Sequence, residues 1–391
     1  MKALIKDDRI GKMLTLTLSI LLTVSSALAL FVTKQVFFAI KNYKFHTEKV
    51  KNLPIEKIPS VTVCIPARNE THAMTRCLEA VINSDYPKLE ILVLDDDSVD
   101  NTSILIKSFA HSGVRFIKGS ALPDGWIGRN FAYQNLATNA NGKYILFMSV
   151  DTHIERSTIS QMVAYLAHKK VEMISVLPVR LDNYRLSVLF STFRFFNELV
   201  LSSKRNAPVT SGAWLVNREL LKEYVGDLSS YKNDVEIESK IGRAFSERNH
   251  YNFLLSPMTG GVSYEKKWNS QVETSIRNYA LSTKGHILKQ FGLFLFLSSF
   301  SLPLVIILYS LLFNYYDFVL ITAVVIEIMF CITYSMFAKL SWSRGSWCAF
   351  LLFPIAAIQE VIIFVTSIIK RQFGTITWKG RNIYTDKKDA S

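Results

Sequence analysis

Long apolar runs occur near both ends of the chain, with a mixed polar and apolar segment between them. Four runs carry no charge or a single carboxylate: residues 13–33, 291–313, 318–338 and 346–369. Each is long enough to cross about 30 Å of bilayer hydrocarbon. We therefore expect one N-terminal and about three C-terminal transmembrane or re-entrant helices, with a water-soluble domain between them.

The first apolar run has two interpretations. Basic residues precede it, and Ala27-Leu28-Ala29 resembles the small-residue site at which a signal peptide is cleaved. The apolar stretch, however, continues through Phe31 and on to Phe38. This continuation favours an uncleaved membrane anchor.

Between residues 45 and 285, short apolar runs alternate with segments of helical periodicity. A short apolar run is typical of a buried strand, and apolar residues at three- and four-residue spacing indicate a helix. Strands separated by helices of about a dozen residues form a mostly parallel sheet. We therefore predict a Rossmann-like α/β domain. The expected strands are 61–66, 89–94, 114–117 and 144–148, and the expected helices are 71–84, 100–111 and 129–140.

Composition narrows the function classes. Hydrophobic residues make up 49% of the 391, and the mean hydropathy is +0.20, which excludes a disordered or disulfide-stapled protein. Lysines and arginines number 45 against 32 carboxylates, giving a net charge of +13. This surplus suits an anionic membrane surface or a phosphorylated substrate. No block of consecutive basic residues occurs, so we expect no nucleic acid partner. The four cysteines form no CxxC pair, and we expect neither a zinc site nor disulfides.

Polar side chains follow two of the predicted strands. Arg68, Asn69 and Glu70 come directly after the first strand, and Asp95 and Asp96 end the second. In an open parallel sheet, ligands bind outside the carboxyl ends of the strands. Directional donors and acceptors at that edge suit a nucleobase and a ribose. Each motif taken alone also fits a polar loop that begins a helix, or a solvated acidic turn.

Asp151 follows the fourth predicted strand. A hard divalent cation such as Mg2+ or Mn2+ binds one or two carboxylates together with substrate phosphates, so Asp151 is a predicted metal ligand. His153 is either a further ligand or a structural residue. Arg129 begins a helix after two glycines, a position that favours binding of phosphate or sugar. No GxGxxG or GxxxxGK[ST] motif occurs, which argues against a dinucleotide oxidoreductase and a P-loop NTPase.

Asp234 and Glu236 lie at the predicted start of a helix. A carboxylate at such a position is usually a helix cap. The same group can act as the general base that takes a proton from an acceptor hydroxyl. The pattern leaves both roles open.

Taken together and in this order, the motifs resemble those of membrane-anchored family 2 glycosyltransferases of the GT-A fold. They are IPARNE (65–70), LDDDSVDNT (94–102), LPDGWIGRNFA (122–132), FMSVDT (147–152), TSGAWLV (210–216) and NDVEI (233–237). The chain looks most like transferases of the diaponeurosporenoate type, with which it shares segments at 276–285 and 373–384. It is more distantly similar to ceramide glucosyltransferase-like enzymes.

The resemblance implies an inverting transfer from a nucleotide diphosphate sugar, with a UDP-sugar as the first expectation. The acceptor would be a hydroxyl or carboxyl of a membrane lipid or isoprenoid. A divalent cation, Mg2+ or Mn2+, would be the cofactor, held by Asp151. The nucleotide sugar would be bound by Arg68, Asn69, Glu70, Asp95, Asp96 and Arg129, and the catalytic base would be Asp234, with Glu236 as a possible substitute.

The chain departs from the family pattern in three places. Ser149 stands where the family has the first Asp of DxD, and Asn233-Asp234 replaces the usual ED pair. The QxxRW motif is absent, although Arg277 stands near its place. Two alternatives therefore stay open: a processive polysaccharide synthase, which would need QxxRW, and a non-catalytic membrane scaffold derived from a glycosyltransferase.

The resemblance and the apolar runs together suggest a multi-pass protein of the cell membrane. Activated sugars are made in the cytosol, so the α/β domain is expected to face the cytoplasm. Four spanning helices would place the basic tail outside, whereas a re-entrant last segment would return it to the cytosolic side. The reverse orientation satisfies the basic residues but separates the domain from its donor.

We expect five segments along the chain. Residues 186–205 and 268–290 have the pattern of interfacial helices with basic polar faces, which would bring a lipid acceptor to the edge of the sheet. The segments are an anchor at 1–44, the GT-A domain at 45–267, an interfacial helix at 268–290, membrane helices at 291–369 and a basic tail at 370–391.

Overall fold

The structure is a computed structural model of the chain. It describes residues 8–43, 58–181, 192–203, 206–258, 261–283, 285–313, 318–342, 344–378 and 381–382. The predicted boundary between the anchor and the GT-A domain, part of the predicted interfacial segment 186–205 and the last residues of the tail lie outside the described residues.

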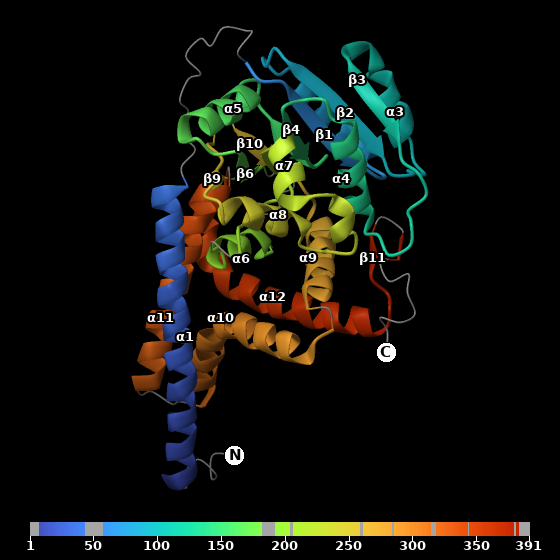
Figure 1. Cartoon of the computed structure of the whole chain (residues 1–391). Helices are drawn as coiled ribbons and strands as arrows, with labels where there is room; N and C mark the ends of the chain where they lie inside the picture. The colour runs from blue at the N-terminus through green and yellow to red at the C-terminus, as the bar shows by residue number, and fades with distance from the viewer. Residues whose placement is uncertain are drawn as a thin grey trace.

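A seven-stranded sheet forms the centre of the α/β domain, with the strand order β3-β2-β1-β4-β8-β6-β9 (Figure 1). Neighbouring strands pair in parallel, except that β8 is antiparallel to both β4 and β6. The predicted mostly parallel α/β fold is therefore confirmed. The strands are β1 Val61–Ala67, β2 Leu89–Asp95, β3 Val114–Lys118, β4 Tyr144–Met148, β6 Met173–Leu177, β8 Ala213–Asn217 and β9 Tyr251–Leu255.

The strands read as apolar runs because helices bury both faces of the sheet. Side chains alternate along β1, so that Val63 and Ile65 pack on one face while Cys64 packs on the other. Helices α2 (Thr71–Ile82) and α5 (Thr158–Lys169) cover the first face. Helices α4 (Gly128–Asn139), α7 (Arg218–Val225) and α8 (Ile237–Ser246) cover the second.

The predicted helix at 100–111 is shorter in the structure. Helix α3 spans Thr102–Ser108, and a 3-10 turn over Ala110–Ser112 follows it. Gly113 then adopts a φ of 83°, a left-handed conformation that glycine reaches without the steric cost of a side chain. The chain therefore leaves the helix early and turns into β3.

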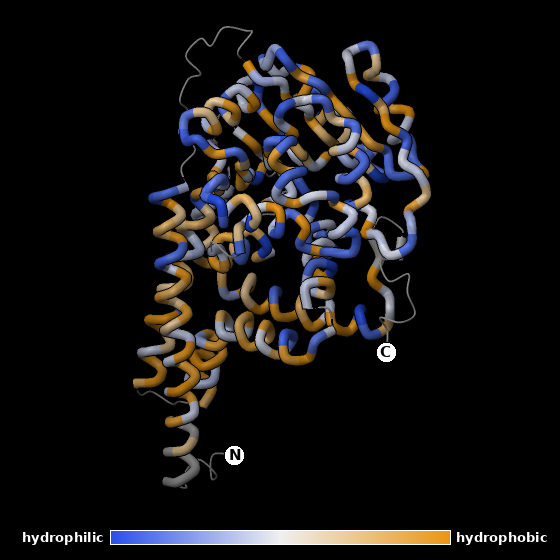
Figure 2. The backbone as a smooth tube through the Cα atoms, viewed as in Figure 1, coloured by the Kyte–Doolittle hydropathy of each residue, from blue (hydrophilic) through white to orange (hydrophobic). Residues whose placement is uncertain are grey.

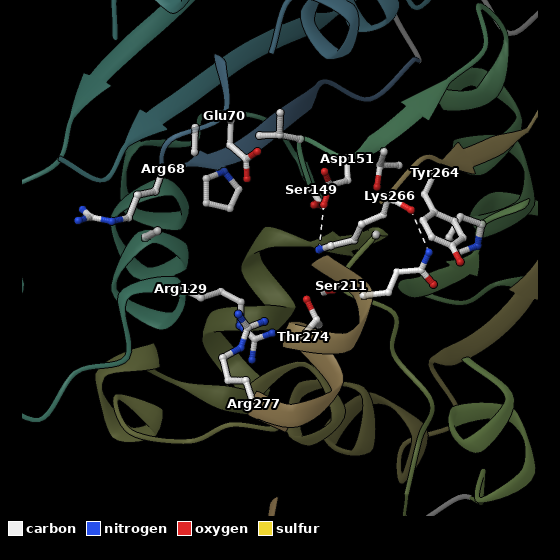
Figure 3. Close-up of a pocket in the computed structure, with 18 of the residues that line it drawn as sticks. Arg68, Glu70, Arg129, Ser149, Asp151, Ser211, Tyr264, Lys266, Thr274 and Arg277 are labelled. Atoms are coloured by element: carbon white, nitrogen blue, oxygen red, sulfur yellow. Dashed lines mark hydrogen bonds and ion pairs between the residues drawn. The ribbon is translucent and has the colours of Figure 1, made fainter. Parts of the chain in front are cut away.

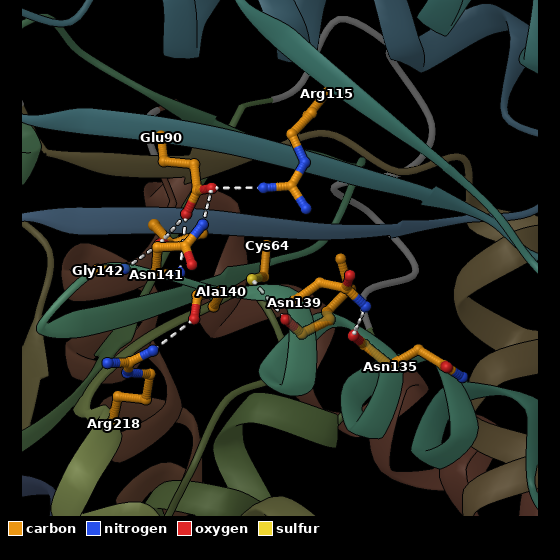
Figure 4. A network of polar contacts seen from close by, with 11 residues as sticks. Cys64, Glu90, Arg115, Asn135, Asn139, Ala140, Asn141, Gly142 and Arg218 are labelled. Carbon is orange, nitrogen blue, oxygen red and sulfur yellow. Dashed lines mark hydrogen bonds and ion pairs between the residues drawn. The ribbon is translucent and has the colours of Figure 1, made fainter.

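A polar network fixes the register of β1, β2 and β4 at the amino ends of the strands (Figure 4). The Glu90 carboxylate accepts the Thr62 hydroxyl at 2.7 Å and the Asn141 backbone N–H at 2.9 Å, and it lies 2.8 Å from Arg115 Nη1. Burial raises the pKa of Glu90, but these hydrogen bonds outweigh it and hold the pKa below its usual value. The network lies at the edge of the sheet opposite the polar motifs.

A second, three-stranded sheet has the order β5-β10-β7. Strand β5 (Thr152–Ile154) pairs antiparallel with β10 (Val262–Tyr264), which pairs in parallel with β7 (Val179–Arg180). Because β5 begins one residue after Asp151, this small sheet joins the carboxyl end of β4 to a segment more than a hundred residues away. No periodicity in the sequence indicates strands this short.

Four helices are long and apolar enough to cross a membrane, one near the N-terminus and three toward the C-terminus, as predicted. Most of their residues are hydrophobic, whereas hydrophilic residues are frequent in the α/β domain (Figure 2). Helices α1 and α11 run away from that domain (Figure 1). The four helices are α1 Asp8–Asn42, α10 Ile287–Phe313, α11 Phe318–Ser341 and α12 Ala349–Gln372, and a short hairpin of β11 (Thr377–Trp378) and β12 (Arg381–Asn382) follows them.

Helix α12 lies across the underside of the α/β domain (Figure 1). There it contacts α6 (Arg194–Val200) and α9 (Trp268–Ser282). The Glu360 carboxylate accepts the Phe193 backbone N–H at 3.0 Å and the Tyr279 hydroxyl. Near the helix end, Arg371 Nη1 donates to the Ala280 oxygen at 2.8 Å. Both the middle and the end of α12 are thus held against the α/β domain.

Candidate active site

A cavity of about 150 Å³ opens at the carboxyl ends of β1 and β4. We call it the first cavity. Five of the predicted site residues line it, and four of these, Arg68, Glu70, Arg129 and Asp151, are labelled in Figure 3. The five are Arg68, Glu70, Asp96, Arg129 and Asp151. The sheet brings these residues together because parallel strands end at the same edge of a sheet, as the positions of the motifs after the strands predicted.

Two other predicted nucleotide-binding residues, Asn69 and Asp95, do not line the first cavity and instead shape its loops. Asp95 accepts hydrogen bonds from two serine hydroxyls. Asn69 adopts a φ of 51°, and its side-chain oxygen accepts a backbone N–H from the β2–α3 loop at 2.9 Å. Arg68 lines the cavity and also donates to the Asp96 backbone oxygen, which ties the two loops together.

Arg129 lies at the start of α4 and is held from two sides. Its Nη1 is 3.1 Å from the Glu238 carboxylate, and its Nη2 donates to the Val235 oxygen at 2.7 Å. Burial would lower the pKa of Arg129, but the Glu238 carboxylate outweighs it and keeps the pKa raised. Arg129 is therefore a fixed positive charge at the cavity wall.

Asp151 is paired with Lys266, whose Nζ is 3.1 Å from the Asp151 Oδ2. Ser149 also lines the cavity, but within the described ranges no group of three His, Cys, Asp or Glu is placed to hold a metal. Mg2+ and Ca2+ sites are built from several oxygen ligands. The one carboxylate at this position is already paired with a lysine, so the protein groups around Asp151 do not fit a divalent cation by themselves.

His153, considered as a further metal ligand, does not line the first cavity. It lies on β5, directly after Thr152, which does line the cavity, and successive side chains of a strand point to opposite faces. Burial and the nearby Arg76 lower the pKa of His153 to about 4, so that it is neutral at physiological pH. Its position favours the structural interpretation.

The structure adds three cations to the wall that the motifs did not assign to the site. Lys266 follows β10 and Arg277 lies within α9 (Figure 3). Arg194 begins α6. Burial lowers the pKa of Arg277 to about 9, and the positive charges of Arg129 and Arg194 contribute to the decrease. The sequence offered one signal for these residues, the position of Arg277 near the place of the missing QxxRW. Lys266 and Arg194 stand in no motif.

A second cavity of about 230 Å³ adjoins the first, and Arg129, Arg194 and Ser211 line both. Its wall comes from α6, α8 and α9 and is rich in serine and asparagine side chains. Glu236 lines this second cavity, as do Glu198 and Glu238. Burial raises the pKa of Glu198 to about 7, against the opposing effect of Arg194.

Asp234, the predicted base, lines neither of these cavities. Its carboxylate is paired with Lys240 and accepts the Glu236 backbone N–H at 3.0 Å, which is a local capping contact before α8. Its backbone oxygen accepts from the Asn130 side chain at 2.7 Å. Asp96 and Asp151 thus share one cavity, while Asp234 lines neither this cavity nor the second.

A family model agrees with the fold and the motif order. The model of glycosyl transferase family 2 matches residues 62–225. This segment belongs to glycosyl transferase family 2. The match confirms the resemblance on which the expectation of a glycosyltransferase rests, and the motif NDVEI at 233–237 lies beyond the matched segment.

Curated relatives of this glycosyl transferase family 2 domain match in shorter segments. A probable glycosyltransferase of Bacillus subtilis, YdaM, is 30% identical over 122 residues, 29% of this chain and 29% of that protein. A ceramide glucosyltransferase of Komagataella phaffii is 29% identical over 112 residues, 27% and 22% of the two chains. A 4,4'-diaponeurosporenoate glycosyltransferase of Staphylococcus aureus is 27% identical over 136 residues, 34% and 35%. The chain thus spans about a third or less of the length of these relatives.

Among solved structures, the mannosyltransferase PcManGT from Pyrobaculum calidifontis, in complex with GDP-Man and Mn2+, has a TM-score of 0.51 at 17% identity. The likeness covers 90% of this chain and 98% of that chain. At this identity the likeness concerns the fold alone, and it agrees with the predicted GT-A fold.

Proposed function

We propose that this protein is an inverting glycosyltransferase that moves a sugar from a nucleotide diphosphate sugar to a lipid acceptor at a membrane surface. One observation carries the proposal: two adjoining cavities meet at Arg129, Arg194 and Ser211. The first lies at the carboxyl ends of the strands of a family 2 domain. The second lies among helices on the side of the apolar helices.

The first cavity suits the donor. Glu70 and Asp96 face it from the ends of β1 and β2, where carboxylates can accept hydrogen bonds from a nucleobase and a ribose. The cations on the opposite wall suit a diphosphate, because fixed positive charges bind phosphate oxygens without reorganisation. We propose a UDP-sugar as the donor to test first, and a GDP-sugar as the second.

The second cavity suits the polar end of the acceptor. Its serine and asparagine side chains offer hydrogen bonds to hydroxyl groups. Helices α6 and α9 form part of its wall and are joined to the apolar α12 through Glu360. An amphiphile with its chain in the bilayer can therefore present a hydroxyl or carboxyl to the donor. This placement supports a lipid or isoprenoid acceptor.

A carboxylate is needed to take the proton from the acceptor hydroxyl. Glu236 lines the second cavity, whereas Asp234 is paired with Lys240. We assign the base to Glu236 and keep Asp234 as the alternative. The acceptor oxygen attacks the anomeric carbon in line as the bond from that carbon to the diphosphate oxygen breaks, and the proton goes to the base. The nucleoside diphosphate leaves, and the configuration inverts.

The membrane placement follows from the donor. Nucleotide sugars are made in the cytosol, so the domain is proposed to face the cytoplasm of a multi-pass membrane protein. The contacts of α12 with α6 and α9 support a last apolar segment that re-enters or lies at the interface. The basic tail would then stay on the cytoplasmic side, as the positive-inside rule favours. A reporter fused to the C-terminus and detected outside the cell would overturn this orientation.

The experiment that tests the function uses purified full-length protein in detergent with radiolabelled UDP- and GDP-sugars and a lipid extract. We expect label in the lipid phase from wild type, and loss of it in Asp151→Ala and Glu236→Gln. Glu223→Gln, an exposed carboxylate on α7, is the matched control and should keep wild-type turnover. Unchanged turnover in Glu236→Gln, with loss in Asp234→Asn, would transfer the base role to Asp234.

A second candidate function is a non-catalytic scaffold. Two features favour it. Lys240 pairs with Asp234, the residue at the position of the family's catalytic base, and Ser149 replaces the first acidic residue of the family's metal-binding DxD motif. A protein that binds UDP or GDP but transfers no sugar to lipid, and hydrolyses none, would support the scaffold and refute the transferase.

A further inference from the structure

Three features of the first cavity concern how a diphosphate is neutralised there. The position at which the family resemblance places a divalent cation offers a single carboxylate, Asp151, because Ser149 replaces the first acidic residue of the pair. That carboxylate faces the Lys266 ammonium at 3.1 Å. A cation bound at Asp151 would have to share this carboxylate with a fixed positive charge.

The backbone, rather than a chance rotamer, places Lys266 beside Asp151. Strands β5 and β10 pair antiparallel with Tyr264 opposite Thr152, so the residues just outside this pair are brought together. The pairing continues one step further, where the Glu265 N–H donates to the Asp151 oxygen at 3.1 Å. Lys266 comes next, and its side chain is 22% exposed. The small sheet therefore holds the ammonium at the cavity wall.

The cavity carries a surplus of positive charge. The cationic side chains in its lining are Arg68, Arg129, Arg194, Lys266 and Arg277, against Glu70, Asp96 and Asp151. Two carboxylates of the second cavity offset part of this surplus: Glu238 pairs with Arg129, and Glu198, whose pKa burial raises to about 7, lies 3.5 Å from Arg194. Burial is the main cause of the lowered pKa of Arg277, and repulsion by the nearby charges of Arg129 and Arg194 adds to it. A bound anion relieves that repulsion, because it supplies the opposite charge that the lining lacks.

We propose that Lys266, oriented by Asp151, acts with Arg194 and Arg277 to neutralise the diphosphate of the donor in place of a divalent cation. The inference rests on the proposed function and names how its donor is held. When the bond between the anomeric carbon and the diphosphate oxygen breaks, the electron pair stays on the nucleoside diphosphate. Fixed ammonium and guanidinium groups stabilise that charge without reorganising. Asp151 is then a positioning residue for Lys266.

The test measures nucleotide and metal binding separately from turnover. Purified full-length protein is titrated with UDP and with GDP by calorimetry in EDTA and again with added Mn2+, and Mn2+ binding is followed by electron paramagnetic resonance. We expect wild type to bind one of the nucleotides in EDTA with a dissociation constant within about twofold of that in Mn2+. Lys266→Ala should weaken binding in EDTA by about tenfold, the effect of losing about 1.4 kcal/mol from one charge-assisted contact.

Two variants sharpen the test. Lys266→Arg keeps the charge and should bind in EDTA like wild type, which separates the loss of charge from a general disturbance of the fold. Lys267→Ala changes the neighbouring lysine, which is exposed and does not line the cavity, and should also match wild type. In Lys266→Ala the Asp151 carboxylate loses its partner, so Mn2+ binding should appear and should restore part of the nucleotide affinity.

The outcomes are distinguishable. Nucleotide binding by wild type that is lost in EDTA and restored by Mn2+ would overturn the inference and leave the proposed function standing. Equal nucleotide affinity of Lys266→Ala and wild type in EDTA would overturn it as well. A wild-type protein that binds neither UDP nor GDP under either condition would refute the proposed function, and the inference with it.

Discussion

Replacing Glu238 by glutamine removes the negative partner of Arg129 while keeping the shape of the side chain. The Glu238 carboxylate lies 3.1 Å from Arg129 Nη1, and its side chain is 6% exposed. It also accepts the Tyr133 hydroxyl at 3.2 Å. Because a guanidinium stays charged at any physiological pH, Arg129 would keep a partly buried charge without its partner.

The structure sets the size of the effect. At 3.1 Å and an effective dielectric constant of about 20, two unit charges attract by about 5 kcal/mol. In the variant, Arg129 keeps its hydrogen bond to the Val235 oxygen at 2.7 Å, and this contact offsets part of the lost attraction. We expect Glu238→Gln to lower the free energy of unfolding by about 3 kcal/mol, in the range for broken buried pairs. For a domain of this size the melting temperature falls by about 6 to 12 °C.

Thermal unfolding in detergent, followed by tryptophan fluorescence, measures this change. The matched control is Glu247→Gln, directly after the end of the same helix. Glu247 pairs with Arg243 at 2.7 Å, and the two side chains are 47% and 52% exposed. Exposed pairs contribute less than about 1 kcal/mol, so this variant should unfold within about 4 °C of wild type. Equal shifts in the two variants would refute the argument that burial makes the Arg129–Glu238 pair strong.

Three further changes have defined outcomes. Gly119→Ala would bring a Cβ to 2.5 Å from the Asp95 backbone oxygen at the end of β2, so we expect a lower melting temperature and weaker nucleotide binding in calorimetry. In Gly292→Ala the new Cβ meets no atom within 4 Å, and this control should behave like wild type. Glu198→Gln removes a carboxyl whose pKa is raised to about 7 in the folded protein, so folded wild type loses stability as the pH rises toward 7. The variant should have a higher melting temperature than wild type at pH 8 and the same melting temperature at pH 4. A difference that stays constant with pH would contradict this. Glu360→Gln weakens the contacts of α12 with Tyr279, so amide hydrogen exchange in α9 should quicken, and unchanged exchange would show that α12 is held elsewhere.

Local patterns were sufficient for the outline of the fold. The four predicted strands and the four apolar helices are all present, because an apolar run of given length has few stable environments: the interior of a sheet or a bilayer. The order of the polar motifs also indicated that Asp96 and Asp151 meet at one edge, since parallel strands end together. For Asn69 and Asp95 the patterns predicted a position beside the site, but not that both side chains would bind neighbouring loop residues instead of lining the first cavity. The Asn69 side chain is held by a hydrogen bond to a residue thirty positions away, and the Asp95 side chain by two nearby serine hydroxyls, and neither contact leaves a pattern in the sequence.

The sequence by itself thus indicated the family resemblance through the order of its motifs. It also determined the α/β alternation and the apolar helices, because each of these depends on neighbours within about a dozen residues. Tertiary structure alone decided the wall of the site. Lys266 reaches Asp151 only through the pairing of β5 and β10, two strands too short to leave a periodic signal. The placement of α12 across the domain also depends on contacts between distant segments, such as those of Glu360 with Phe193 and Tyr279, which local propensity does not specify.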